Sequence, residues 1–376
     1  MAAVPAFIFH APAAAQELPQ WGLVEDVRFV DPDGGAPVLT TIGHFLPLPD
    51  GRTVVTQRVD NELWLFDSDG VFRQRFGGRG EGPGEFRSLS YATVIADSVW
   101  VVDPILRRAT GLPLDGGSAR TEPLPSLAVA PGARHRFRLA NGSYLAYAEL
   151  ALRPDGPLVQ ENPLLLLAAD GTRLDTMAVL PDMPLLGRFQ IDGRSVSTPL
   201  RIPAPTGRWA AAPDGERFVT VQPGPPSEAP RTMLVRMFAA SGQELWRRLL
   251  PYPEAARLSE AERAAATAGL ADRLAQRGVD RRTAERLAAE LEVPAIGPPA
   301  QWVWVGTDGR VWLQLDGGGT HIPASTWLVL DPDGRPEASV AVPARVYPWA
   351  AGPGVVWAAV YDEFDSPTLV RYRIGA

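Results

Sequence analysis

A unit of four short strands recurs along this chain, and the recurrence limits the folds open to it. The clearest copy spans residues 48–103. Two β-rich runs meet at the Asp-Gly couplet 50–51, two more meet at the DSDG turn 67–70, and a glycine-rich segment leads onward. Asp-Gly couplets between such runs are strong hairpin signals. The stretch therefore predicts two hairpins that form one four-stranded sheet.

Comparable turns return at intervals, as in a repeat architecture. Inner-hairpin turns are predicted at 50–51, 97–98, 141–142, 214–215, 308–309 and 352–354, and outer-hairpin turns at 67–70, 115–117, 170–171, 241–242 and 331–334. The final inner hairpin is followed by one unpaired strand, 368–374, whose partner is available at 21–30. Closing a ring in this way removes open sheet edges. We therefore predict an all-β fold, a six-bladed β-propeller closed by the N-terminal strand.

One segment breaks the strand pattern. Residues 253–294 are rich in Ala, Glu and Arg, with leucines at helical spacings. Ser259 and Glu262 form a capping-box pattern, and residues 278–280 interrupt the helical sequence. About 40 residues are too few for an independent core. We expect a helical-hairpin insertion between blades four and five, within a single propeller domain spanning residues 17–376.

The N-terminal residues 1–16 suggest export. A short apolar stretch is followed by three alanines and a glutamine, as at the end of a secretory signal, although the basic beginning of such a signal is missing. We read this as a truncated signal peptide, with an unstructured apolar terminus as the alternative. No apolar run approaches the ~20 residues that span a bilayer. The expected location is periplasmic or secreted.

Charge and composition exclude several partners and reactions. The formal net charge is -7, the 36 basic residues are all arginine, and they form no basic run. Nucleic acid is therefore not an expected partner. The absence of cysteine excludes disulfides, thiol nucleophiles and thiolate metal sites. No nucleophile–base motif or calcium-loop pattern is present.

The glycine-rich crossing carries a resemblance to a known family. Residues 77–86 read GGRGEGPGEF, with DSDG before them and VWVVD after them. This combination resembles an NHL-repeat blade and, more closely, the exported bacterial six-bladed β-propeller family. The blade pattern covers residue 21 to the C-terminus, but the crossing motif occurs once. The resemblance implies the fold and no general activity, since related propellers include binding scaffolds, calcium-dependent lactonases and lyases.

The ends of the second strands are one set of candidate binding residues. Propeller sites usually lie around the central channel, on the face where blades are connected. Seven residues after the inner-turn glycine, or at the matching place, the chain carries Arg58, Asp103, Glu149, Gln222, Asp316 and Tyr361. These side chains predict a mostly polar ring at the channel mouth. The alternative is that they hold neighbouring loop backbone, as Asp often does at turns.

The first strands supply a second set of candidates. Seven residues before the inner-turn glycine, the chain carries His44, His135, Arg208 and Trp302. A histidine pair can bind a metal or act as a base. Without a third ligand nearby, solvated or hydrogen-bonded channel histidines are the better interpretation. Glu85, with Glu81, lies in the glycine-rich crossing, where positive φ angles explain the glycines better than a calcium site does.

The resulting functional expectation is a binding scaffold without catalytic activity. It would act as a monomer in the cell envelope, recognise a protein, peptide or glycan at the channel mouth, and need no cofactor. The alternative is a calcium-dependent, lactonase-like hydrolase or lyase acting in the channel, with the cation held by some of Asp103, Glu149 and Asp316.

Overall fold

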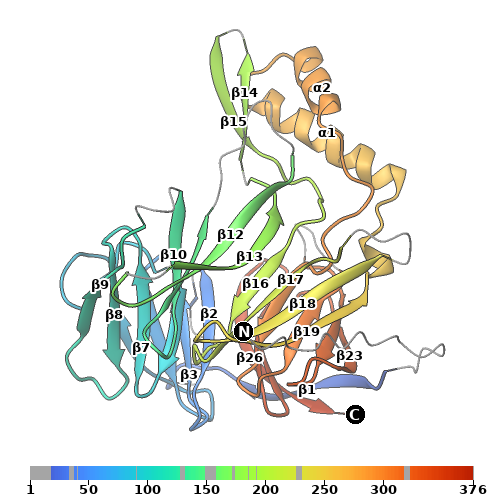
Figure 1. The fold of residues 1–376 in the computed structure, drawn as a ribbon. Coiled ribbons are helices and arrows are strands. Elements are labelled where there is room, and N and C mark those ends of the chain that lie inside the picture. The colour runs from blue at the N-terminus through green and yellow to red at the C-terminus, as the bar shows by residue number, and fades with distance from the viewer. Residues whose placement is uncertain are drawn as a thin grey trace, which may run out of the picture.

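The computed structural model describes residues 18–375, apart from 34–37, 40, 90, 128–131, 149–157, 172–173, 185, 192, 226–230 and 317–321. The export signal expected at residues 1–16 lies outside the described residues. Six four-stranded blades form a closed ring (Figure 1). The inner strand of the last blade, β24, contacts that of the first, β2. The predicted six-bladed β-propeller is confirmed.

The first three blades follow one another in sequence, each built from two antiparallel hairpins. Blade one contains β2 (Ile42–Pro47), β3 (Thr53–Gln57), β4 (Glu62–Phe66) and β5 (Phe72–Gly77). Blade two contains β6 (Tyr91–Ile95), β7 (Ser98–Asp103), β8 (Arg108–Pro113) and β9 (Arg120–Pro123). Blade three contains β10 (Ala133–Arg138), β11 (Tyr144–Ala148), β12 (Gln160–Leu167) and β13 (Leu174–Asp182).

The other three blades have the same arrangement, and the first of them begins at Arg208, 26 residues after blade three ends at Asp182. Blade four contains β16 (Arg208–Ala211), β17 (Arg217–Pro223), β18 (Thr232–Ala239) and β19 (Glu244–Pro251). Blade five contains β20 (Trp302–Val305), β21 (Val311–Gln314), β22 (Ser325–Leu330) and β23 (Pro336–Val342). Blade six contains β24 (Val346–Gly352), β25 (Val355–Tyr361), β26 (Pro367–Gly375) and the N-terminal strand β1 (Gln20–Arg28).

Strand β1 closes the ring as predicted, although it ends two residues before the predicted limit at residue 30. It pairs antiparallel with β26, and Leu23 lies opposite Ile374. Figure 1 shows β1 beside the C-terminal strand. Gln20 and Trp21 also pair in parallel with β23 of blade five, so blades five and six share one eight-stranded sheet. The first residues of β1 therefore also pair with the neighbouring blade.

The glycine-rich crossing joins blades one and two in the conformation that its glycines permit. Gly77, Gly78 and Gly84 have φ angles of 84°, 136° and 79°, a region that residues with a Cβ rarely occupy. The crossing ends at Phe86, which is fully buried in a hydrophobic cluster shared by the two blades. Phe86 thus anchors the connection between blades one and two.

A small lobe projects from the propeller between blades three and five (Figure 1). It combines the hairpin β14 (Leu186–Ile191) and β15 (Arg194–Pro199) with η1 (Glu254–Ala256), α1 (Glu260–Gln276) and α2 (Arg281–Glu290). The capping box at Ser259 is present, and Asp280 caps α2. The helical insertion therefore lies within the predicted residues 253–294. The β14–β15 hairpin was not predicted from the sequence.

The lobe has its own apolar core. Leu270 and Leu274 of α1 are fully buried, together with Leu200, which follows β15. The Arg273 guanidinium donates hydrogen bonds to the carbonyls of Pro199 and Leu200, at 3.0 and 2.9 Å. These contacts join the helices to the hairpin. None of the helices in the described ranges is long and apolar enough to cross a membrane.

Candidate functional site

The candidate site is a cavity of about 540 Å³ enclosed by the inner strands. All six blades contribute to its wall. Asp182, at the end of β13, and Gly207, just before β16, also line it. The chain between them forms the β14–β15 hairpin, so both connections of that hairpin border the cavity. A volume of this size lies within the range of pockets that hold small molecules.

Nine aromatic rings line the wall. They come from all six inner strands and the second strand of blade three: Phe45, Tyr91, Phe137, Tyr147, Trp209, Trp302, Trp304, Tyr347 and Trp349. On one side, Tyr91 and Phe137 have ring centroids 4.8 Å apart, and Trp209 lies 5.8 Å from Phe137. On the other side, Tyr347 lies 6.2 Å from Trp302. Such rings provide large rigid contact faces for a ligand.

Charged groups interrupt the aromatic wall. Arg58, Arg136 and Arg208 supply guanidiniums, Asp182 supplies a carboxylate, and His44 supplies an imidazole. Burial lowers the pKa of Arg208, whereas nearby Asp182 acts in the opposite direction. The Tyr147 hydroxyl donates to Asp182 Oδ2 at 2.7 Å. Burial raises the pKa of Tyr147, and the Asp182 charge raises it further, so this hydroxyl keeps its proton at neutral pH.

The two candidate histidines are not equivalent in space. His44 lines the cavity, with its ring 5.6 Å from that of Tyr91. In blade three, Arg136 lines the cavity instead, and His135 is buried elsewhere. The reason is that β-bulges lie at different places in the two strands: the register of β10 against β11 shifts between His135 and Phe137, and that of β2 against β3 shifts between Ile42 and Phe45. An extra residue in a strand re-aims the side chains around it, so His44 and His135 do not line the same cavity.

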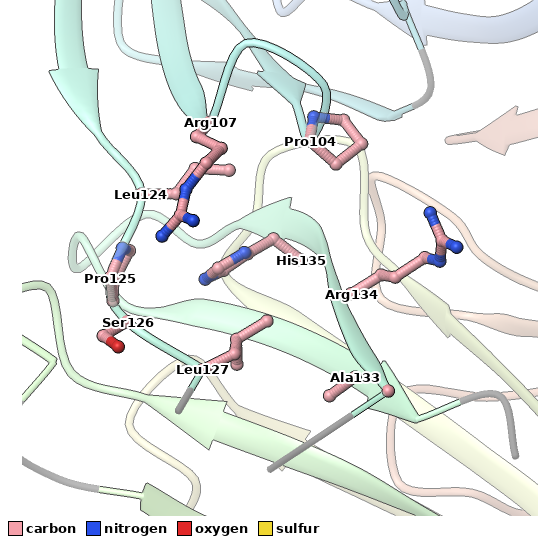
Figure 2. A pocket seen from close by; sticks show the side chains of 10 residues that line it. Pro104, Arg107, Leu124, Pro125, Ser126, Leu127, Ala133, Arg134 and His135 are labelled. Carbon is pink, nitrogen blue, oxygen red and sulfur yellow. The ribbon is translucent and has the colours of Figure 1, made fainter. Parts of the chain in front are cut away.

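His135 lies in a second pocket of about 450 Å³, bordered by Pro104, Arg107, Leu124 and Arg134. Figure 2 shows the His135 ring and the Arg107 guanidinium on facing sides of this pocket, with Arg134 directed away. Burial lowers the pKa of His135 to about 4; a hydrogen bond to the Pro125 backbone opposes this and Arg107 adds to it. His135 is therefore neutral at neutral pH.

The second-strand ends that the structure describes do not form a polar ring around this cavity. Arg58 is the member of that set on the cavity wall, while Gln222 and Tyr361 are partly buried outside it. Glu149 lies outside the described residues. The physical reason is distance: second strands lie about 4.8 Å farther out than the inner strands. A long side chain such as that of Arg58 is needed to reach the cavity.

The acidic candidates hold loop backbone. Asp103 is fully buried and accepts backbone N–H bonds from the loops on either side, at Arg87, Ser88, Ile105 and Leu106. Asp316 accepts the Thr326 N–H. Glu85 accepts the Gly82 N–H at 2.8 Å inside the crossing. Within the described ranges, no group of three or more His, Cys, Asp or Glu side chains is arranged to hold a metal ion.

The sequence pattern did not identify several residues that line the cavity. Tyr347 also lies seven residues before an inner-turn glycine, Gly354, so the rule that selected His44 could have found it. Trp304 lines the cavity, with its ring stacked 4.3 Å from that of Trp327. Arg136 was hidden by the bulge. Asp182 and Tyr147 come from outer and second strands, and no spacing in the sequence identifies them.

Comparison with known proteins supports the fold. A family model described as a 6-bladed beta-propeller matches residues 38–131. A solved structure of a DUF4221 family member from Bacteroides vulgatus is 10% identical, with a TM-score of 0.51 and coverage of 96% of this chain and 99% of that one. Sequence and structure agree. The protein is a six-bladed β-propeller.

Two further structures are similar over most of their length. A candidate exported protein from Bacteroides fragilis is 11% identical, with a TM-score of 0.48 and coverage of 95% of this chain and 96% of that one. The calcium-binding protein regucalcin from Agrobacterium tumefaciens is 11% identical, with a TM-score of 0.43 and coverage of 94% and 96%. The search of curated proteins found no match.

Proposed function

We propose that this propeller is an exported binding protein that recognises its ligand in the central cavity and catalyses no reaction on it. The observation that carries the proposal is the wall of the cavity, where nine aromatic rings, from all six blades, surround one small-molecule-sized space. Pockets built from aromatic faces with a few polar groups bind ligands by burial and orient them by hydrogen bonds. The export pattern of residues 1–16 supports a periplasmic or secreted location.

The test is binding to an array of glycans and peptides, repeated with Trp302→Ala. The Trp302 side chain lines the cavity and its residue is 51% exposed, so the substitution should leave the fold intact. Affinity for the cavity ligand should fall by about tenfold or more, as for aromatic anchors. Phe364→Ala is the matched control, because Phe364 is 80% exposed and lies outside the cavity. Ligands that bind Trp302→Ala and the parent equally would contradict the proposal.

We extend the proposal to cofactors: the protein acts without calcium. The oxygens of Asp103 already accept four backbone hydrogen bonds, and Asp316 lies three blades away around the ring. Calcium prefers six to eight oxygen ligands at one point. Thermal melts with calcium and with a chelator should therefore coincide. A stoichiometric metal whose removal lowers the melting temperature would favour the hydrolase or lyase alternative.

A further inference from the structure

The second pocket, which contains His135, is separate from the central cavity. It lies between blades two and three, where the turn after β7, the segment after β9 and the start of β10 meet. Its volume of about 450 Å³ is large enough for a small molecule. None of the described residues that line it also lines the central cavity. A molecule bound here would therefore occupy a site of its own.

His135 brings an unpaired hydrogen-bond acceptor to this pocket. The residue is 7% exposed, and its ring makes a hydrogen bond with the backbone of Pro125. Because proline has no N–H, the ring donates this bond to the Pro125 carbonyl. Nε2 is buried and has no hydrogen-bond partner among the described residues, so the donating nitrogen is Nδ1. In the neutral ring Nε2 is then an acceptor, and a donor on a ligand would satisfy it.

Arg107 places a cation opposite this acceptor. Figure 2 shows its guanidinium facing the His135 ring. Arg107 is exposed, and among the described residues its guanidinium has no hydrogen bond or ion pair. The turn that carries it is fixed, because Asp103 accepts the Leu106 N–H and the Arg107 carbonyl accepts the Leu124 N–H, both at 3.0 Å. The φ angle of Arg107 is 54°, a conformation that residues other than glycine keep only where the surroundings hold it.

The rest of the described wall limits what a ligand can carry. It contributes short apolar groups and no carboxylate that could pair with a ligand cation. Arg134 is exposed and points away from the pocket in Figure 2. An ammonium group would therefore lie near Arg107 without a compensating charge. A carboxylate alone would leave Nε2 of His135 unpaired, whereas a hydroxyl adds a donor without adding charge.

We propose that this pocket binds a small hydroxy acid, whose carboxylate accepts hydrogen bonds from the Arg107 guanidinium and whose hydroxyl donates to His135 Nε2. The planar guanidinium matches a carboxylate with two parallel N–H···O bonds. The carbon chain of the acid would contact Leu124 and Leu127, which line the same pocket. The two sites share no described residue, so this inference does not depend on the ligand of the central cavity.

The experiment follows the histidine ring nitrogens of the full chain by NMR during titration with 2-, 3- and 4-hydroxybutyrate. The chain has four histidines, and comparison with His135→Gln assigns the His135 signals. Nε2 of His135 should resonate as an unprotonated nitrogen and shift upfield as a hydroxyl donates to it. At least one hydroxybutyrate should bind about tenfold more tightly than butyrate, which lacks the donor, and than its own amide, which lacks the charge.

Arg107→Asn should reduce the affinity for that hydroxy acid about tenfold and leave the affinity for its amide unchanged. Asparagine tolerates the left-handed conformation at this position, so the variant should fold. Arg134→Asn is the matched control, because Arg134 borders the same pocket and points away from it. Equal binding of butyrate and the hydroxybutyrates, or equal effects of the two substitutions, would overturn the inference. So would a His135 spectrum in which Nε2 carries the proton, or one that none of the three acids shifts.

Discussion

At the scale of single residues, buried polar groups show how the propeller connects its loops. Asp103 was a candidate ligand, yet its side chain is fully buried and joins the crossing before blade two to the turn after β7. A buried carboxylate that accepts several backbone N–H groups is a structural element rather than an open binding site. Removing it would leave those donors without partners.

We therefore expect Asp103→Ala to be strongly destabilising. Unsatisfied buried N–H groups cost about 1–3 kcal/mol each before relaxation, so a loss of roughly 3–5 kcal/mol is expected. Denaturant unfolding of the variant measures it. Asp214→Ala is the control: Asp214 accepts the Glu216 N–H on an exposed turn, and its loss should cost less than about 1 kcal/mol. Equal effects of the two substitutions would contradict this role for Asp103.

His135 predicts a specific dependence of stability on pH. Burial lowers its pKa from 6.5 to about 4. Between these values the unfolded chain binds the proton and the folded protein does not, so stability falls as pH falls from 6.5 towards 4. Protonation of His135 should lower the free energy of unfolding by roughly 2–3 kcal/mol between pH 7.5 and pH 4.5. Unfolding free energies at pH 7.5 and pH 4.5 should differ less in His135→Gln than in the parent protein. An unchanged difference would show that His135 protonates freely in the fold.

At the scale of elements, the projecting lobe is a unit with its own core. Its helices were predicted because leucines recur at helical spacing and Ser259 and Glu262 form a capping box. Its hairpin has an Asp-Gly couplet at 192–193, the same turn signal as in the blades. The hairpin connects the two cavity-lining positions Asp182 and Gly207, so damage to the lobe can alter the cavity without unfolding the blades.

Leu274→Ala tests this local unit. The side chain is fully buried between α1, α2 and the segment after β15, and such truncations cost about 2–5 kcal/mol. We expect hydrogen exchange to accelerate throughout α1, α2 and β14–β15, while the strands of blades one, two and six keep their protection. Ala289→Gly on the exposed face of α2 is the control and should cost about 1 kcal/mol. Uniformly faster exchange would show that the lobe and propeller unfold together.

At the scale of the whole molecule, stability depends on ring closure. Strand β1 pairs with β26 and, by its first two residues, with β23. A chain lacking residues 1–28 should expose the edge of β26, melt at a lower temperature and associate through that edge, because unpaired edges recruit other strands. A chain lacking only residues 1–17 is the control. Thermal unfolding and light scattering measure both, and identical behaviour of the two truncated chains would contradict closure by β1.

The sequence by itself determined the repeat, the number of blades, the closing strand and the helical insertion, because these follow from local turn chemistry and strand periodicity. Phe86 and the glycines of the crossing were also predictable, since their roles depend on neighbouring residues. The tertiary structure alone decided the cavity wall. A bulge in β10 places Arg136, and not His135, on the cavity wall. Second strands lie farther from the propeller axis, so of the described candidates at their ends only the long side chain of Arg58 lines the cavity. Such side-chain placement depends on pairing between distant strands, which local spacing does not encode.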